Sequence, residues 1–264
     1  MRAIGIDAIS YVGTTLLSMI LGSHPQCRSV GHCYLFFGKY REKKKYLLEK
    51  DNVCEICDLL DIDCSLNKLK EARHVQDPYE FIREGEEIII DSSSVSEWFK
   101  WSNPDKIIYM FRNPVSLLSS YFKSLGRSQK TIEYMCNAYI RKYSGARGLA
   151  IEYHNILSDT PALRNLFKAL DLEFSPEYLK YWNYSNHMVG GSKSVLISIA
   201  KYRCPEKAES IIKKAAHNNK DYIQYYRDDF NGSIDIATPK DKTQVMLKCE
   251  KVYKYLQSLQ DVSL

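Results

Sequence analysis

An apolar stretch, a Gly-Thr-Thr turn and a second apolar segment follow one another at the start of the chain, in AIGIDAISYVGTT (residues 3–15) and LLSMILGSHP (residues 16–25). A glycine at the end of a strand lets the backbone turn tightly, and the next residues place free N–H groups and two hydroxyls at the positive end of a helix. This pattern predicts an anion site. In the ATP-type loop a lysine follows the last glycine, whereas Thr14 follows Gly13 here. The segment therefore favours a phosphate-bearing ligand other than Mg-ATP.

Short apolar runs alternate with helical patterns along the chain. The runs are rich in isoleucine and bounded by polar or proline-containing segments, as is typical of buried parallel strands, and they cover residues 3–9, 87–91, 106–111 and 149–153. Helices are predicted over residues 14–21, 115–124, 131–143, 161–170, 205–217 and 242–259. This order predicts an α/β protein with a parallel sheet covered by helices on both faces. Such sheets bind ligands at the carboxyl ends of their strands, where the turn at Gly13 lies.

The length of the chain predicts one compact domain. With 264 residues, of which 45% are hydrophobic, the chain can bury a sizeable core. We expect a single domain over residues 1–264 with a helical insertion at about 36–86, where the sequence is polar and rich in lysine and glutamate. The basic run within it, residues 39–45, is interpreted as a solvated helix face rather than a binding patch.

The charge balance limits the classes of partner. Subtracting 32 acidic from 37 basic residues gives a net charge of +5, and the basic residues are mostly scattered. This argues against a nucleic-acid partner and favours small anionic ligands. No apolar run reaches the length of a membrane span, and the amino terminus does not show a secretory pattern. We therefore expect a cytoplasmic protein without a membrane span.

Three of the eight cysteines lie close together in the sequence. Cys54, Cys57 and Cys64 have the spacing C-x2-C-x6-C, and His74 follows ten residues later. Zinc sites use such residues, but the usual second pair is absent and His74 lies among charged residues. A chain that is not secreted keeps its cysteines mostly reduced. Free or packing cysteines are the favoured interpretation, and we predict no metal.

A second candidate anion site begins at the predicted strand 106–111. This strand delivers Arg112 to its carboxyl end, Pro114 starts a helix, and Ser120 lies eight residues after the arginine. A guanidinium fork suits a phosphate dianion, and a serine hydroxyl adds one more hydrogen bond. Taken alone, the pattern is better explained by an Arg112 paired with a carboxylate and a Ser120 bonded within its own helix.

Together the two segments resemble the family of sulfotransferases that use 3′-phosphoadenosine 5′-phosphosulfate (PAPS). The amino-terminal motif of that family is matched by GTTLL at 13–17 and GSHP at 22–25. Its second motif, Arg-[Asp/Asn]-Pro with a serine eight positions after the arginine, is matched by RNP at 112–114 and Ser120. Partial matches follow at 91–93, 152–153 and 186–191. The resemblance spans roughly residues 3–195 and implies a three-layer P-loop-type fold with a central parallel sheet.

The resemblance also implies a nucleotide site. Arg112 with Ser120 would hold the 3′-phosphate, and Tyr153 is a candidate for a contact near the adenine or ribose. PAPS carries a phosphate group at each end of an adenosine, so it needs two separated anion sites, and it needs no magnesium. The loop assigned to the 5′-phosphosulfate comprises Tyr11, Val12, Gly13, Thr14 and Thr15.

Sulfuryl transfer further requires a base, and cations for the developing charge. His32 follows Gly31 where many family members carry a base, and a neutral imidazole accepts a proton at neutral pH. Two positions that are basic in many members are Tyr11 and Ser94 here. Lys193 is the candidate replacement cation, with His187 as an alternative.

The predicted function is transfer of a sulfuryl group from PAPS to a hydroxyl of a saccharide or small metabolite, with no metal required. Protein tyrosine is a less favoured acceptor. One alternative is a protein that binds PAPS or its product PAP (3′-phosphoadenosine 5′-phosphate) but has weak transfer activity, as Tyr11 and Ser94 permit. Another is a P-loop kinase or NTPase, in which Asp91 would end a metal-binding strand, although the missing loop lysine argues against it.

Overall fold

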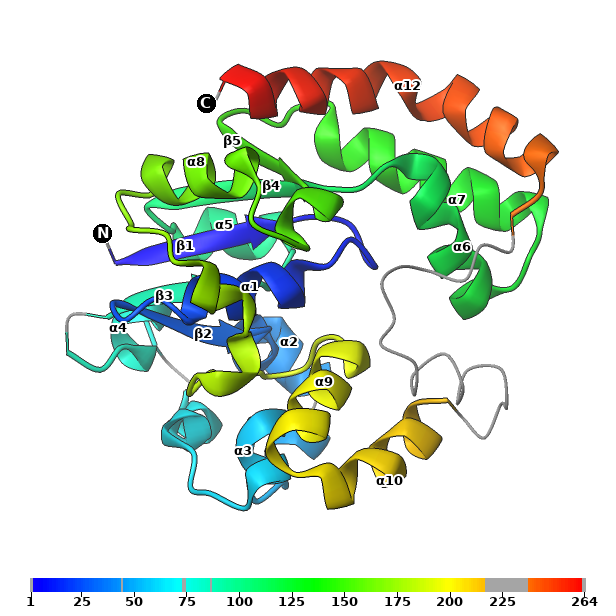
Figure 1. Ribbon diagram of the computed structural model, residues 1–264. Coiled ribbons are helices and arrows are strands. Elements are labelled where there is room, and N and C mark those ends of the chain that lie inside the picture. The colour runs from blue at the N-terminus through cyan, green and yellow to red at the C-terminus, as the bar shows by residue number, and fades with distance from the viewer. Residues whose placement is uncertain (1, 44, 73–74, 86, 217–236, 263–264) are drawn as a thin grey trace. The chain divides into compact units, whose positions relative to one another are not determined.

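A computed structural model describes residues 2–43, 45–72, 75–85, 87–216 and 237–262. Its five strands form a parallel sheet in the order β2-β3-β1-β4-β5, with helices flanking it (Figure 1). The α/β class and the helix-flanked parallel sheet predicted from the sequence are thus confirmed. The strands are β1 (Ala3–Asp7), β2 (Cys27–Gly31), β3 (Ile88–Asp91), β4 (Lys106–Phe111) and β5 (Leu149–Glu152).

The described residues divide into two compact units, each assembled from several segments. The first unit takes them from Met1–Ile6, Thr15–Lys106 and Ser175–Asp228, and the second from Asp7–Thr14, Ile107–Phe174 and Asp229–Leu264. The two units are distinguished by the contacts within each of them. The single domain expected over residues 1–264 stays a prediction.

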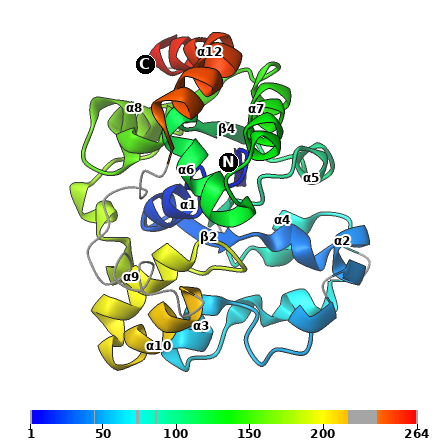
Figure 2. The ribbon, with the colours of Figure 1, turned by 90° about the vertical axis from the view of Figure 1, so that its right-hand side faces the viewer.

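The first unit contains three parallel strands whose residues are all buried. Ala3 pairs with Ile89 between β1 and β3, and Cys27 pairs with Ile88 between β2 and β3. Among its helices, α9 packs against both α3 and α10 (Figure 2). The helices are α1 (Thr14–Gly22), α2 (Gly38–Lys43), α3 (Glu55–Leu60), α4 (Pro78–Ile82), α5 (Ser96–Ser102), α9 (Lys193–Arg203) and α10 (Pro205–Ala215), with shorter 3-10 helices η1 (Cys33–Phe36), η2 (Lys45–Leu47), η3 (Ser65–Glu71), η5 (Pro176–Leu179) and η6 (Tyr181–Asn183).

Strand β2 and helices α5 and α9 were not predicted. The sequence of β2, CRSVG, has no apolar run, and its Arg28 is buried in ion pairs with Glu84 at 3.1 Å and Glu87 at 3.6 Å. Paired charges of this kind let an arginine lie inside a sheet layer, which a pattern of apolar residues does not reveal. The described residues between η1 and β3 form only helical elements, as expected, while their status as an insertion stays a prediction.

The second unit joins two parallel strands to long helices. Ile108 of β4 pairs with Leu149 of β5, and α12 runs along α6 and α7 (Figure 1). Asn113 and Thr160 accept hydrogen bonds at the starts of α6 and α8, each followed by a proline at the first helical position. The helices are α6 (Pro114–Leu125), α7 (Gln129–Tyr143), α8 (Pro161–Ala169) and α12 (Pro239–Val262), with the 3-10 helix η4 (Tyr153–Ile156). In the described parts of the chain, no helix combines the length and apolar character needed to cross a membrane.

Candidate functional site

The loop after β1, residues 8–13, is anchored by helix α7 of the second unit. The Tyr143 hydroxyl accepts a hydrogen bond from the Ile9 N–H at 3.2 Å and donates one to the Met110 carbonyl at 2.6 Å. The neighbouring Lys142 forms an ion pair with the buried Asp7. Because both contacts are shielded from water, they fix the loop more firmly than surface contacts would.

Gly13, Tyr153 and Arg112 form one cluster. Gly13 has a φ of +108°, and a Cβ added there would lie 2.5 Å from Cδ2 of Tyr153. The Cζ atom of Arg112 lies 4.6 Å from the centre of the same ring. Three residues that the sequence assigned to the nucleotide therefore lie together, and the close approach of the aromatic ring is what requires glycine at position 13.

Arg112 is held in position by the start of helix α6. Its residue surface is only 9% exposed, and its Nε donates to the Ser116 hydroxyl at 3.0 Å. Ser116 in turn donates to the Asn113 carbonyl at 2.9 Å. Ser120 lies one turn further along the same helix face and is half-buried. Sequence reasoning missed Ser116, the serine that contacts the guanidinium.

Lys123 is a second cation on this face of α6. It follows Ser120 by three positions, which places both side chains on one side of the helix. Burial and, secondarily, the charge of Arg112 lower the pKa of Lys123. Two cations that repel one another in a partly buried place are stabilised by an anion between them. Ser116, Ser120 and Lys123 are spaced by four and then three residues, which places them on one face of a helix. This spacing is the sequence signal that could have identified Lys123.

Tyr11 and Val12 complete the loop without adding charge. Tyr11 has a φ of +67° and is 46% exposed, and its hydroxyl is hydrogen-bonded to the Ser124 hydroxyl. Its ring meets that of Tyr121 edge-on, with centroids 5.1 Å apart. Val12 is buried, so any ligand contact there is through its backbone. The position that is basic in many members of the resembled family is therefore a phenol directed to α6.

In the first unit, Thr15 and His32 both contact the loop at residues 189–192. The Thr15 hydroxyl oxygen accepts a hydrogen bond from the Ser192 N–H at 3.1 Å. The backbone N–H of His32 donates to the Val189 carbonyl at 2.7 Å. This one loop therefore positions both the predicted base and a threonine assigned to the phosphosulfate.

The environment of His32 keeps its imidazole neutral. Burial lowers the pKa of His32 from 6.5 to about 4. At neutral pH the ring therefore holds a lone pair that can accept a proton. A pKa this low also makes the free imidazole a weak base.

Lys193 is the first residue of helix α9 and follows Gly190, Gly191 and Ser192 directly. Its Nζ lies 3.2 Å and 3.3 Å from the two carboxylate oxygens of Glu55, and its side chain is 51% exposed. The proposed replacement cation is therefore already paired with a carboxylate of α3.

The carboxylate of Asp91, at the end of β3, is buried and hydrogen-bonded to other side chains and to the backbone. One of its oxygens accepts from the Ser93 N–H at 2.8 Å and from the Ser93 hydroxyl. The other accepts from the Tyr79 hydroxyl at 2.9 Å and from Nε1 of Trp98 at 2.5 Å. Burial raises the pKa of this carboxyl group. Because both oxygens are engaged with protein donors, Asp91 is poorly placed to bind a metal-nucleotide, which argues against the kinase alternative.

The cysteine cluster has a different histidine from the one suggested by the sequence. His74 lies outside the described residues, whereas His187 lies with Cys54, Cys57 and Cys64. The sequence offers no spacing rule for this arrangement, because His187 follows Cys64 by more than a hundred residues.

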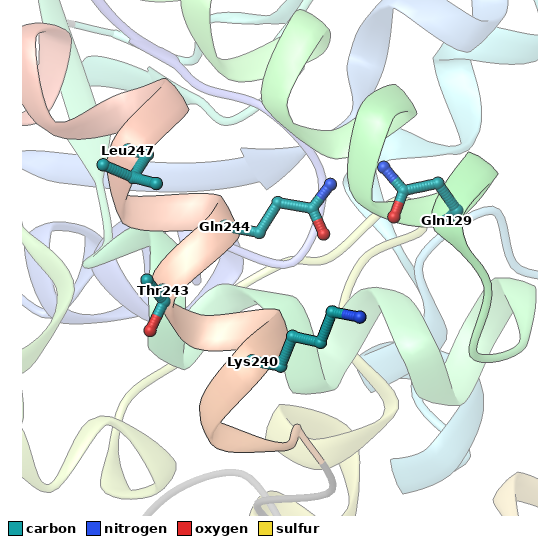
Figure 3. Close-up of a pocket in the computed structure, with 5 residues that line it drawn as sticks. All are labelled: Gln129, Lys240, Thr243, Gln244 and Leu247. Carbon is teal, nitrogen blue, oxygen red and sulfur yellow. The ribbon is translucent and has the colours of Figure 1, made fainter.

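A shallow surface pocket of about 520 Å³ lies between the starts of α7 and α12 in the second unit (Figure 3). The amide groups of Gln129 and Gln244 face one another across it, and Lys240, Thr243 and Leu247 complete its lining. None of these residues belongs to the Gly13, Tyr153 and Arg112 cluster, so we do not assign the nucleotide to this pocket.

Comparison with known proteins gives a match only at the level of structure. No family model matches the sequence, and no curated protein matches it. The sulfotransferase domain from the curacin biosynthetic pathway aligns with a TM-score of 0.52 and 14% identity, over 94% of this chain and 96% of that one. The protein therefore has the fold of a sulfotransferase domain, and the family resemblance is confirmed at that level.

Weaker alignments are found with two crystal structures of retinol dehydratase. One holds androsterone and the inactive cofactor PAP, with a TM-score of 0.35 over 100% of this chain and 80% of that one, and the other holds retinol and PAP, with a TM-score of 0.31 over 100% and 81%. Both are 11% identical to this chain. Their low TM-scores add nothing to the assignment of the fold.

Proposed function

We propose that the protein is a sulfotransferase that moves a sulfuryl group from PAPS to a hydroxyl group of a saccharide or small metabolite. The observation that carries the proposal is the cluster of Gly13, Tyr153 and Arg112 in the second unit, with Arg112 held by Ser116. This cluster combines a backbone turn that opens a helix with a positioned guanidinium, and these are the two kinds of anion site that a nucleotide with two separated phosphate groups requires.

The 3′-phosphate would be bound by Arg112. Its Nε is engaged by Ser116 at 3.0 Å, so the direction of the guanidinium plane is set before a ligand arrives. Ser120 and Lys123 continue the same helix face and would add a hydroxyl donor and a second positive charge. Tyr153 packs against both Gly13 and Arg112 and would form the wall beside the ribose or adenine.

The 5′-phosphosulfate would be bound at the start of α1. Helix N-termini present unpaired N–H groups and a positive dipole end, and the helix begins at Thr14 directly after the Gly13 turn. The contact from Ser192 leaves the Thr15 hydroxyl hydrogen able to donate to a phosphate or sulfate oxygen.

In the transfer step, the acceptor oxygen attacks sulfur as the bond from sulfur to the bridging phosphate oxygen breaks. The neutral His32 imidazole would take the proton of the acceptor hydroxyl, and PAP would leave with the electron pair of the broken bond. Lys193 would stabilise charge on the leaving group only if it exchanged Glu55 for the ligand. The proton on His32 would then pass to solvent.

A second candidate function is PAP or PAPS binding with little transfer. Ser94, at the other usually basic position, has a φ of +57°, and its hydroxyl donates to the Ser92 carbonyl at 3.2 Å. Among the described residues, Tyr11 is neutral and Lys193 is paired with Glu55, so neither of these two positions offers an unpaired cation to the leaving group. This observation favours a binding protein over a kinase as the alternative.

Incubation with radiolabelled PAPS and a panel of hydroxyl-bearing saccharides and metabolites distinguishes the two functions. A sulfotransferase should yield a sulfated product and an equal amount of PAP, and His32→Ala should abolish both. Tight PAP binding together with no product, from any acceptor, would support the binding protein instead. A Tyr11→Lys variant that gains transfer activity would identify the missing cation.

A further inference from the structure

Three sulfur atoms and one imidazole nitrogen converge within the first unit. The ligand atoms of Cys54, Cys57, Cys64 and His187 all lie within 4.8 Å of one another. Nδ1 of His187 lies 3.4 Å from Sγ of Cys57 and 3.5 Å from Sγ of Cys64. In a tetrahedral zinc site, with Zn–S and Zn–N lengths of about 2.3 Å and 2.0–2.1 Å, a nitrogen and a sulfur are about 3.6 Å apart. The two nitrogen-to-sulfur distances therefore already suit one zinc ion.

We propose that these four residues bind a structural zinc ion. Three thiolates and one imidazole make a closed set of four protein ligands, which is the usual composition of a structural rather than a catalytic zinc site. The three cysteines are buried, and no acidic side chain belongs to the cluster found among the described residues. This ligand chemistry favours zinc over calcium, magnesium or manganese, which prefer oxygen ligands. The proposal does not depend on sulfuryl transfer.

Two backbone N–H groups are directed at the sulfur of Cys54. The N–H groups of Cys57 and Met188 donate to Sγ of Cys54 at 3.4 Å and 3.2 Å. Since the deprotonated sulfur is the form that binds a metal, donors directed at sulfur prepare the cluster for zinc.

The imidazole of His187 must change its hydrogen bonding when zinc binds. Nε2 lies 3.4 Å from a guanidinium nitrogen of Arg28, which can donate to it only while Nε2 is unprotonated. Zinc at Nδ1 would leave the ring proton on Nε2 and end that contact. Arg28 keeps its ion pair with Glu84 at 3.1 Å and its contact with the Ser65 hydroxyl, so it stays satisfied. Binding would release protons from the three cysteines, and the cluster of Zn²⁺ with three thiolates would carry a net charge of −1 beside the Arg28 guanidinium.

The zinc would fasten the loop that contacts His32 and Thr15. Cys54 and Cys57 belong to the start of α3, Cys64 precedes η3, and His187 lies two residues before Val189. The Glu55 N–H donates to the Met188 carbonyl at 2.8 Å, so α3 and this loop are already joined at the backbone. The same loop contacts His32 and Thr15 further on. A four-ligand site here would tie two segments that are far apart in the sequence.

The test is the metal content of the full-length chain, measured by mass spectrometry after any affinity tag is removed. We expect about one zinc ion per chain, and loss of at least nine tenths of it in Cys57→Ser and His187→Ala. Cys33→Ser and Cys204→Ser are matched controls, since both thiols are buried but lie outside the cluster, and they should keep the zinc. A wild-type chain that binds no zinc even after reconstitution under reducing conditions would overturn the proposal, as would full retention in His187→Ala.

Cobalt substitution gives a readout that does not depend on the stability of the variants. Co²⁺ bound to the wild-type chain should show thiolate charge-transfer absorption and the intense visible bands of tetrahedral coordination. His187→Cys should keep one metal ion and shift these bands toward those of a four-sulfur site. Octahedral-type weak absorption, or a disulfide between cluster cysteines in the freshly purified chain, would contradict the proposal.

Discussion

Replacing Arg112 by alanine should weaken PAP binding in a way that depends on the 3′-phosphate. Arg112 is 9% exposed, and its guanidinium is held by Ser116 at Nε and stacked on Tyr153, so little ordering is needed when a phosphate binds. Loss of a charge-assisted, two-point contact of this kind costs about 2–4 kcal/mol. At about 1.4 kcal/mol per factor of ten, Kd should rise about 30- to 700-fold.

Isothermal titration calorimetry with PAP and with adenosine 5′-phosphate, which lacks the 3′-phosphate, measures this effect. Arg112→Ala should weaken PAP binding strongly but change adenosine 5′-phosphate binding little. Arg164→Ala is the matched control, because Arg164 lies in the same unit in an exposed ion pair with Asp159. Equal losses for both ligands, or an unchanged Kd for PAP, would refute the assignment of the 3′-phosphate to Arg112.

Three further predictions concern the base, the loop and its anchor. Burial depresses the pKa of His32 to about 4, so in a pH–rate profile kcat/KM should stay nearly level from neutral pH down to about pH 5 and fall only near pH 4. A fall centred near the ordinary histidine pKa of 6.5 would contradict this prediction. Gly13→Ala should reduce PAP affinity at least tenfold by calorimetry, since the added Cβ would meet the Tyr153 ring at 2.5 Å, whereas an unchanged affinity would show that the loop yields. Lys142→Met should lower the free energy of unfolding by about 3–5 kcal/mol in urea titrations, because it removes the ammonium group that pairs with the buried Asp7. A loss below about 1 kcal/mol would argue against a buried pair.

Much of the fold follows from local sequence patterns. The isoleucine-rich runs predicted β1, β3, β4 and β5, and proline at the first helical position predicted where α8 begins. Strand β2 was missed because its burial depends on Arg28 pairing with glutamates that lie more than fifty residues away. Helix α9 was missed because it begins directly after Gly190, Gly191 and Ser192, and the Ser192 side chain makes no capping hydrogen bond that would mark its start. The structure of both segments, β2 and α9, therefore depends on contacts with residues that are distant in the sequence.

The candidate site was predictable only where it rests on local motifs. Gly13 and Arg112 stand at strand ends that the sequence reveals, and family resemblance added Tyr153. The role of Ser116 depends on the side-chain direction of Arg112, which a sequence does not specify. His187 joins the cysteines through a loop whose path is set by tertiary packing, so neighbouring His74 was the only histidine that spacing could suggest.

Titration of the protein with PAP in the presence of a magnesium chelator, alongside titration with Mg-ATP, tests the proposed function most directly. A PAPS-dependent sulfotransferase should bind PAP with micromolar or tighter affinity without magnesium and should bind Mg-ATP far more weakly. Absence of PAP binding, or a preference for Mg-ATP, would contradict the assignment of the Gly13, Tyr153 and Arg112 cluster to PAPS.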